Sequence, residues 1–89
     1  MFLAKVYVTL KPTVNDPQGL TVLGGLHTLG FEAVEDVRIG KYMEIRLEAL
    51  GVEAASVKVR EMCQQLLANP VIEHFRFDLE KTATEPTAP

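Results

Sequence analysis

Residues 2–11 read F-L-A-K-V-Y-V-T-L-K, and this stretch decides the fold that we expect. Apolar side chains take every second position from residue 2 onward. A period of two places them on one face of a β-strand and the residues between them on the other. One face carries Phe2, Ala4, Val6, Val8 and Leu10; the other carries Lys5, Tyr7, Thr9 and Lys11. The stretch predicts a half-buried strand, which Pro12 ends.

The next signal, T-V-N-D-P-Q-G at residues 13–19, predicts the start of a helix. Asp16 is a favoured N-cap residue, and Pro17 lacks an N–H at the position where a helix leaves that group unpaired. Leucine and valine then recur at helical spacing as far as residue 29. Gly30 is typical of a left-handed helix end. We therefore expect a helix over residues 17–29.

Two features of this helix need an explanation: the Gln-Gly pair near its start and the two glycines in its middle. Gln18 and Gly19 near its start could bind an anion through free backbone N–H groups. Asp16 already occupies one donor, however, and no glycine-rich phosphate loop accompanies the motif, so a plain helix start is favoured. Gly24 and Gly25 each cost roughly 1 kcal/mol relative to alanine, which indicates close approach to a neighbouring backbone.

Two further strand-like segments follow, over residues 33–39 and 42–49. Gly40 and Lys41 between them indicate a tight hairpin turn. Arg38 and Lys41 would then flank the tip of the hairpin. Two cations there could bind a carboxylate or phosphate, or remain solvated; solvated charges are the simpler interpretation.

The remaining folded part is predicted to be a helix and a strand. Residues 53–68 have a helical period, and their inward stripe is Ala55, Val59, Met62, Cys63 and Leu66. Asn69 and Pro70 end this helix. Residues 71–80 alternate again as a strand, with Val71, Glu73, Phe75, Phe77 and Leu79 on one face.

The element order is strand, helix, strand, strand, helix, strand. This order predicts an α+β, ferredoxin-like βαββαβ sandwich, in which two helices cover one face of a four-stranded antiparallel sheet. The uncovered face would carry Lys5, Tyr7, Lys11, Tyr42, Glu44, Arg46, His74 and Arg76. Such a mixed polar surface could remain exposed to solvent or contact another subunit.

Composition limits the class of protein. With 89 residues the chain can form one small domain, expected over residues 1–80, with a flexible tail at residues 81–89. A net charge of −3 argues against binding nucleic acid, which requires clustered cations. No apolar run approaches the length of a membrane helix, and a single cysteine excludes CxxC metal sites. We expect a cytoplasmic protein that does not bind a membrane.

No catalytic constellation is visible. His27 and His74 lack a nucleophile or acidic partner at a recognisable spacing, so both are interpreted as structural or surface residues. Cys63 lies on an apolar stripe and is expected in the core. Glu73 alternates onto the apolar face of its strand, where a strand edge or a pairing cation is a simpler explanation than a catalytic acid.

Three blocks in order resemble the PurS family: residues 13–19, L-G-F-E-A-V-E-D-V-R-I-G-K at residues 29–41, and E-M-C-Q-Q-L-L-A-N-P-V-I-E at residues 61–73. PurS is the small subunit of phosphoribosylformylglycinamidine synthase, or formylglycinamide ribonucleotide amidotransferase, in purine biosynthesis. The resemblance covers residues 2–79. It implies a non-catalytic subunit that helps a PurL-type synthetase and a PurQ-type glutaminase to assemble, so that ammonia passes between them.

The resemblance also implies a homodimer or homotetramer, no cofactor in this chain, and ATP with Mg²⁺ in the synthetase subunit. The family blocks match these candidate partner-binding residues: Asp16, Pro17, Gln18, Gly19, Arg38, Gly40, Lys41, Asn69 and Pro70. Two rival functions remain open. An RNA-recognition module would need stacking aromatics and basic charge, and an ACT-like ligand-binding domain would need a more glycine-rich loop after the first strand.

Overall fold

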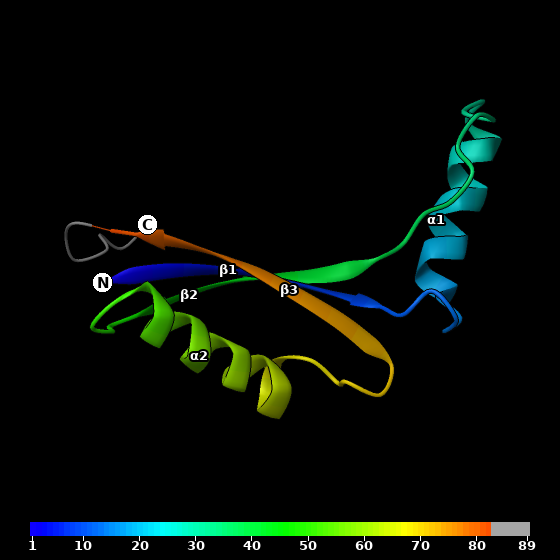
Figure 1. The fold of residues 1–89 in the computed structure, drawn as a ribbon. Helices are drawn as coiled ribbons and strands as arrows, with labels where there is room; N and C mark the ends of the chain where they lie inside the picture. The colour runs from blue at the N-terminus through cyan, green and yellow to red at the C-terminus, as the bar shows by residue number, and fades with distance from the viewer. Residues whose placement is uncertain (83–89) are drawn as a thin grey trace.

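The computed structural model describes residues 1–82 and shows an α+β fold (Figure 1). The helices and strands are β1 (Phe2–Leu10), α1 (Pro17–Thr28), β2 (Gly40–Leu47), α2 (Val52–Met62), a π-helical turn η1 (Cys63–Leu67) and β3 (Glu73–Lys81). The predicted flexible tail falls largely on residues 83–89, outside the described part. Lys81, its first residue, is the last residue of β3.

The sheet has three antiparallel strands in the order β2-β1-β3. β1 is the central strand, and Val6 lies opposite Met43 on β2 and Phe77 on β3. The alternation predicted for β1 is confirmed, because its side chains at positions 2, 4, 6 and 8 are all buried. Position 10 is only half-buried, at the end of the strand.

The core lies between this buried row and α2, which runs along one face of the sheet (Figure 1). Val59 and Cys63 are fully buried against the apolar side of the sheet. Half-buried apolar side chains from both outer strands surround them: Met43, Ile45, Leu47, Phe75, Phe77 and Leu79. The apolar faces expected for these strands are therefore confirmed within β2 and β3, whereas Val71, expected on the same face, lies before β3 and is 77% exposed.

The predicted inward stripe of the second helix fails in its last turn. Leu66 is exposed, whereas Leu67 packs against the core and Ala68 is buried. The cause is η1, whose wider turn shifts the inward face by one residue relative to an α-helix. A regular helical period cannot reveal such a shift.

Helix α1 forms where the sequence predicts it but does not cover the sheet. It projects beyond one end of the sheet (Figure 1), and Gly19 is its only buried residue. Its end is well formed: Phe31 N–H bonds to the Leu26 carbonyl and Gly30 N–H to the His27 carbonyl, with Gly30 at a φ of 100°. Only one helix, α2, therefore covers the sheet, contrary to the expected two.

The predicted hairpin at Gly40 and Lys41 is also wrong, and the fourth strand is not present in residues 1–82. Both residues belong to β2, where Gly40 pairs with Thr9 and Lys41 with Val8. Residues 33–39 instead run back beside α1 and continue directly into β2 (Figure 1). Strand formation needs a neighbouring strand, and within the described part of this chain none lies beside residues 33–39.

Candidate functional site

Asp16 joins the first family block to the second. Its side chain is only 4% exposed, and its two carboxylate oxygens accept hydrogen bonds from the backbone N–H of Gly19 and of Ile39, each at 2.9 Å. The Ile39 bond, followed by the Gly19 bond, holds the pKa of Asp16 below its ordinary value. The predicted N-cap is confirmed, and the same side chain also anchors the segment that enters β2.

Arg38 is held within the chain rather than at a hairpin tip. Its Nη2 donates to the backbone carbonyls of Lys11 at 2.9 Å, Val14 at 3.2 Å and Leu10 at 3.4 Å. These carbonyls belong to the turn that leads from β1 into α1. Arg38 therefore stabilises this turn, although its side chain lies at the surface.

Two glycines of the family blocks allow close backbone approach. A Cβ at Gly19 would collide with the Val37 carbonyl, and a Cβ at Gly40 would collide with the Val8 carbonyl. Both positions accept only a residue without a side chain unless the backbone moves. No such contact surrounds Gly24 or Gly25, so the close approach expected there is not made within the described part of this chain.

The third block reaches the same place through Asn69 and Glu73. Asn69 N–H donates to Glu73 Oε1 at 2.6 Å, and Glu73 N–H donates to the Asn69 carbonyl at 2.7 Å. Lys41 Nζ lies 3.9 Å from the other Glu73 oxygen, and Lys11 N–H donates to the Ile72 carbonyl at 2.8 Å. Glu73 therefore has the pairing cation that its position on an apolar strand face required.

The three blocks thus meet at one end of the sheet, which we call the corner. Its hollow has a volume of about 250 Å³ and is open to solvent. The lining residues are Val8, Leu10, Asp16, Gln18, Ile39, Gly40, Lys41 and Glu73. Ligand pockets usually enclose most of the surface of the ligand, whereas this hollow is open.

The predicted site residues divide into two groups at the corner. Asp16 and Gly19 are buried, and Arg38 is bound to carbonyl groups. The others are exposed and available to a partner: Pro17, Gln18, Gly40, Lys41, Asn69 and Pro70. Leu10, Ile39 and Glu73 also line the hollow but were not among the predicted site residues. Of these three, only Glu73 stood out in the sequence, because it is an acidic residue on the apolar face of its predicted strand.

The residues considered for chemistry have structural environments. His27 Nε2 lies 2.7 Å from the Val34 carbonyl, a contact that ties α1 to the segment after it. Cys63 is buried, and burial raises the pKa of its thiol. Within residues 1–82, no three His, Cys, Asp or Glu side chains lie close enough to hold a metal ion. Nor does any helix there have the length and apolarity to span a membrane.

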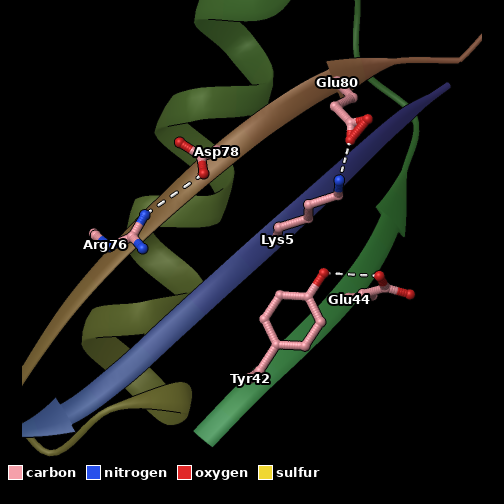
Figure 2. A network of polar contacts seen from close by, with 6 residues as sticks. All are labelled: Lys5, Tyr42, Glu44, Arg76, Asp78 and Glu80. Carbon is pink, nitrogen blue, oxygen red and sulfur yellow. Dashed lines mark hydrogen bonds and ion pairs between the residues drawn. The ribbon is translucent and has the colours of Figure 1, made fainter. Parts of the chain in front are cut away.

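The face of the sheet opposite α2 carries a network of paired polar side chains (Figure 2). Lys5 and Glu80 form an ion pair at 2.5 Å, which raises the pKa of Lys5. Three further contacts connect Tyr42 with Glu44 at 2.8 Å, Arg76 with Asp78 at 3.6 Å, and the Arg76 guanidinium with the Tyr7 ring at 3.9 Å from its centroid. This outer face is the predicted mixed polar surface, and Lys5 and Arg76 are each paired with a carboxylate there.

Comparison with known proteins decides the family. The family model described as PurS, phosphoribosylformylglycinamidine (FGAM) synthase, matches residues 3–81. The chain belongs to the PurS family. PurS subunits of FGAM synthase include that of Bacillus subtilis, 47% identical over 96% of this chain and 100% of its own length, and that of Synechocystis, 51% identical over 84% of this chain and 75% of its own length.

Solved PurS structures share the fold of this chain. Methanocaldococcus jannaschii PurS, described as one of the subunits of formylglycinamide ribonucleotide amidotransferase in the purine biosynthetic pathway, is 39% identical. It superposes with a TM-score of 0.83 over 92% of this chain and 99% of its own. A chain of the Thermotoga maritima PurLQS structure is 28% identical, with a TM-score of 0.80 over 90% of this chain and 99% of its own. PurS from T. maritima therefore occurs in a complex with PurL and PurQ.

Proposed function

We propose that this chain is a non-catalytic, cytoplasmic subunit of FGAM synthase, where it holds a PurL-type synthetase and a PurQ-type glutaminase together so that ammonia passes between them. The observation that carries the proposal is the match to PurS along nearly the whole described chain, including the PurS fold seen in a PurLQS complex. In this proposal the chain works as a homo-oligomer, while ATP and Mg²⁺ act in the synthetase subunit.

The corner supports a role in contacting a partner. Six exposed residues come from three separate blocks, and Gln18, Gly40 and Lys41 among them line a hollow that is open to solvent. Beneath them, Asp16 and Arg38 tie the segments together through backbone hydrogen bonds. A rigidly held, exposed surface loses little conformational entropy on binding, which favours specific protein contact.

Reconstitution tests the proposal. The cognate synthetase and glutaminase are mixed with and without this chain, and glutamine-dependent FGAM formation is measured. We expect activity and co-elution of the three proteins only when the chain is present. The control supplies an ammonium salt in place of glutamine, because direct ammonia bypasses transfer between subunits. Equal glutamine-dependent activity without the chain, or glutaminase or ATPase turnover by the chain alone, would contradict the proposal.

A further inference from the structure

β3, drawn in orange in Figure 1, is an edge strand, and within residues 1–82 no strand lies on its outer side. Two hydrogen bonds continue its pairing with β1: Lys11 N–H donates to the Ile72 carbonyl and Thr82 N–H to the Met1 carbonyl. Bonded and non-bonded pairs alternate along an antiparallel ladder, so the even-numbered residues of β3 bond to β1. The backbone groups that point away from the sheet therefore belong to Phe75, Phe77 and Leu79.

The side chains of these three residues make the edge partly apolar. They lie on the side of the sheet that α2 covers and are only half-buried. An edge strand with free backbone groups can pair with a further strand. Such a strand would bond to β3 through its N–H and C=O groups and cover the apolar row with every second side chain.

Arg60 on α2 lies beside this edge. Its guanidinium is 5.4 Å from the centroid of the Phe77 ring, and this cation–π contact helps to position the charge. Within the described residues, Arg60 forms no ion pair with a carboxylate. Ser56 lies one helical turn earlier on the same side of α2. The edge therefore has an unpaired cation and a hydroxyl group on its α2 side.

A hollow of about 390 Å³, open to solvent, lies at this position. It is lined by Ser56, Arg60, Phe75, Arg76 and Phe77. Both charged residues in this lining are arginines. Arg76 extends from the outer face of the sheet, where its contact with Asp78 at 3.6 Å is exposed and therefore weak. The hollow thus suits a carboxylate that is carried by an extended backbone.

We propose that the free edge of β3 binds an extended segment of another FGAM synthase subunit, which adds a strand to the sheet and places a carboxylate against Arg60. The acidic residue lies opposite Phe77, and apolar side chains two positions before and after it cover Phe75 and Leu79. The inference rests on the proposed function and deepens it, because it names the chemistry of the segment that the chain recognises.

The charge of the site favours an acidic segment over a second copy of β3. Antiparallel pairing of two β3 strands centred on Phe77 would bring the Arg60 side chains of both copies against the same two rings. Like charges at such a distance repel each other. A carboxylate in the place of the second guanidinium supplies the opposite charge at the same position.

The first experiment measures binding of the peptide Thr-Val-Thr-Glu-Thr-Val-Thr to the full-length chain by NMR of the backbone amides. We expect saturable shifts centred on the N–H groups of Phe75, Phe77 and Leu79. Arg60→Glu should raise the Kd by about tenfold or more, because a charge-assisted contact is replaced by repulsion. The matched control Lys58→Glu reverses an exposed charge on the other side of α2 and should leave the Kd unchanged.

Two modified peptides test the mode of binding. With Lys in place of Glu, the peptide should bind Arg60→Glu more tightly than wild type. Methylation of the Val and Glu backbone nitrogens should abolish binding, because these N–H groups face β3, whereas methylation of the two central Thr nitrogens, which face away, should weaken it much less. Absence of binding to wild type, shifts centred away from β3, or equal binding by Arg60→Glu would overturn the proposal.

The second experiment measures hydrogen exchange in the complex with the synthetase and glutaminase. The outward N–H groups of β3 should exchange fast in the chain alone and slowly in the complex. Slow exchange in the chain alone would show that the edge is already occupied, and the proposal would be wrong. A variant that ends at Thr82 then identifies the occupant: exchange becomes fast if residues 83–89 cover the edge and stays slow if a second copy does.

The two proposals fail in distinguishable ways. If glutamine-dependent FGAM formation is indifferent to the chain, the proposed function is wrong, whatever peptide the edge binds. If FGAM formation requires the chain, but Arg60→Glu co-elutes with the other subunits as Lys58→Glu does and the β3 N–H groups stay fast in the complex, the function stands and binding at the edge is wrong.

Discussion

Asp16 has its charge stabilised by two backbone N–H groups, so its contribution to stability depends on pH. Its pKa is lower in the folded chain than in the unfolded chain. The stabilisation is therefore fully present above the unfolded pKa and is lost as pH falls through the folded pKa. We expect the melting temperature of wild type to fall on acidification below about pH 5.

The substitution Asp16→Asn tests whether the Asp16 carboxylate causes this loss of stability in acid. The amide of the new side chain can still accept one hydrogen bond through its oxygen, but it presents N–H donors to the second backbone N–H group, so stability at neutral pH should be lower. Because asparagine does not titrate, the gap in melting temperature between wild type and Asp16→Asn should narrow as pH falls. If the melting temperatures of wild type and Asp16→Asn fall in parallel as pH is lowered, groups other than Asp16 cause the loss of stability in acid.

A substitution at Gly40 tests how closely the backbone of β2 packs against the Val8 carbonyl of β1. The substitution Gly40→Ala places a Cβ against the Val8 carbonyl, which only a backbone shift can relieve. We expect a loss of about 1–3 kcal/mol in the free energy of unfolding, as for other overpacked sites. Gly25→Ala is the control, since a Cβ there meets no atom within 4 Å. Equal effects of the two substitutions in urea denaturation would refute this explanation.

At the scale of single elements, α1 follows its local signals. The Asp-Pro start and the Gly30 end were predicted from the sequence, and the structure confirms both. Caps depend on neighbouring residues alone, so sequence can reveal them. The surroundings of Gly24 and Gly25 were not predictable, because they depend on what lies beside the helix.

Gly24 gives a prediction for this element. Its site is open, and helical spacing places it opposite the face of Val22 and Leu29, so Gly24→Ala should stabilise α1 by up to about 1 kcal/mol through helix propensity. Gly30→Ala should instead destabilise by about 1 kcal/mol, because Gly30 has a positive φ. Thermal melts of both variants check this. A destabilised Gly24→Ala variant would mean that a neighbour contacts this face.

The second helix shows where periodicity stops being informative. Ala55, Val59 and Cys63 were predicted on the inward face and are fully buried. Leu66 was predicted inward and is exposed, because η1 changes the number of residues per turn. Only the packing of this segment against the sheet decides where such a turn forms.

At the scale of the whole molecule, the corner predicts which substitutions disturb assembly. Lys41→Ala removes an exposed cation and should weaken complex formation with the synthetase and glutaminase. Because Lys41 Nζ lies 3.9 Å from the Glu73 carboxylate, the substitution should also lower stability, by at most about 1 kcal/mol. Arg38→Ala also removes three carbonyl contacts, so it should additionally cost about 1 kcal/mol of stability.

The control for this comparison is Lys58→Ala, which removes an exposed cation on α2, outside the three corner blocks. Co-elution and melting temperature are measured for all three variants. If Lys41→Ala binds as well as Lys58→Ala does, the corner is not the contact surface.

The resemblance to the PurS family marked the three blocks of the candidate site. The sequence pattern alone determined the α+β class, the caps and the alternating faces of the three strands. These properties depend on neighbouring residues and on period, which a linear sequence contains. Tertiary structure decided that residues 33–39 form no strand, that α1 leaves the sheet, and that Asp16, Arg38 and Glu73 join the three blocks at one corner. The direction in which the chain leaves one helix or strand for the next depends on contacts between residues that are far apart in the sequence. A local pattern shows which side of an element is apolar, but it does not specify whether that side packs against its own chain or another.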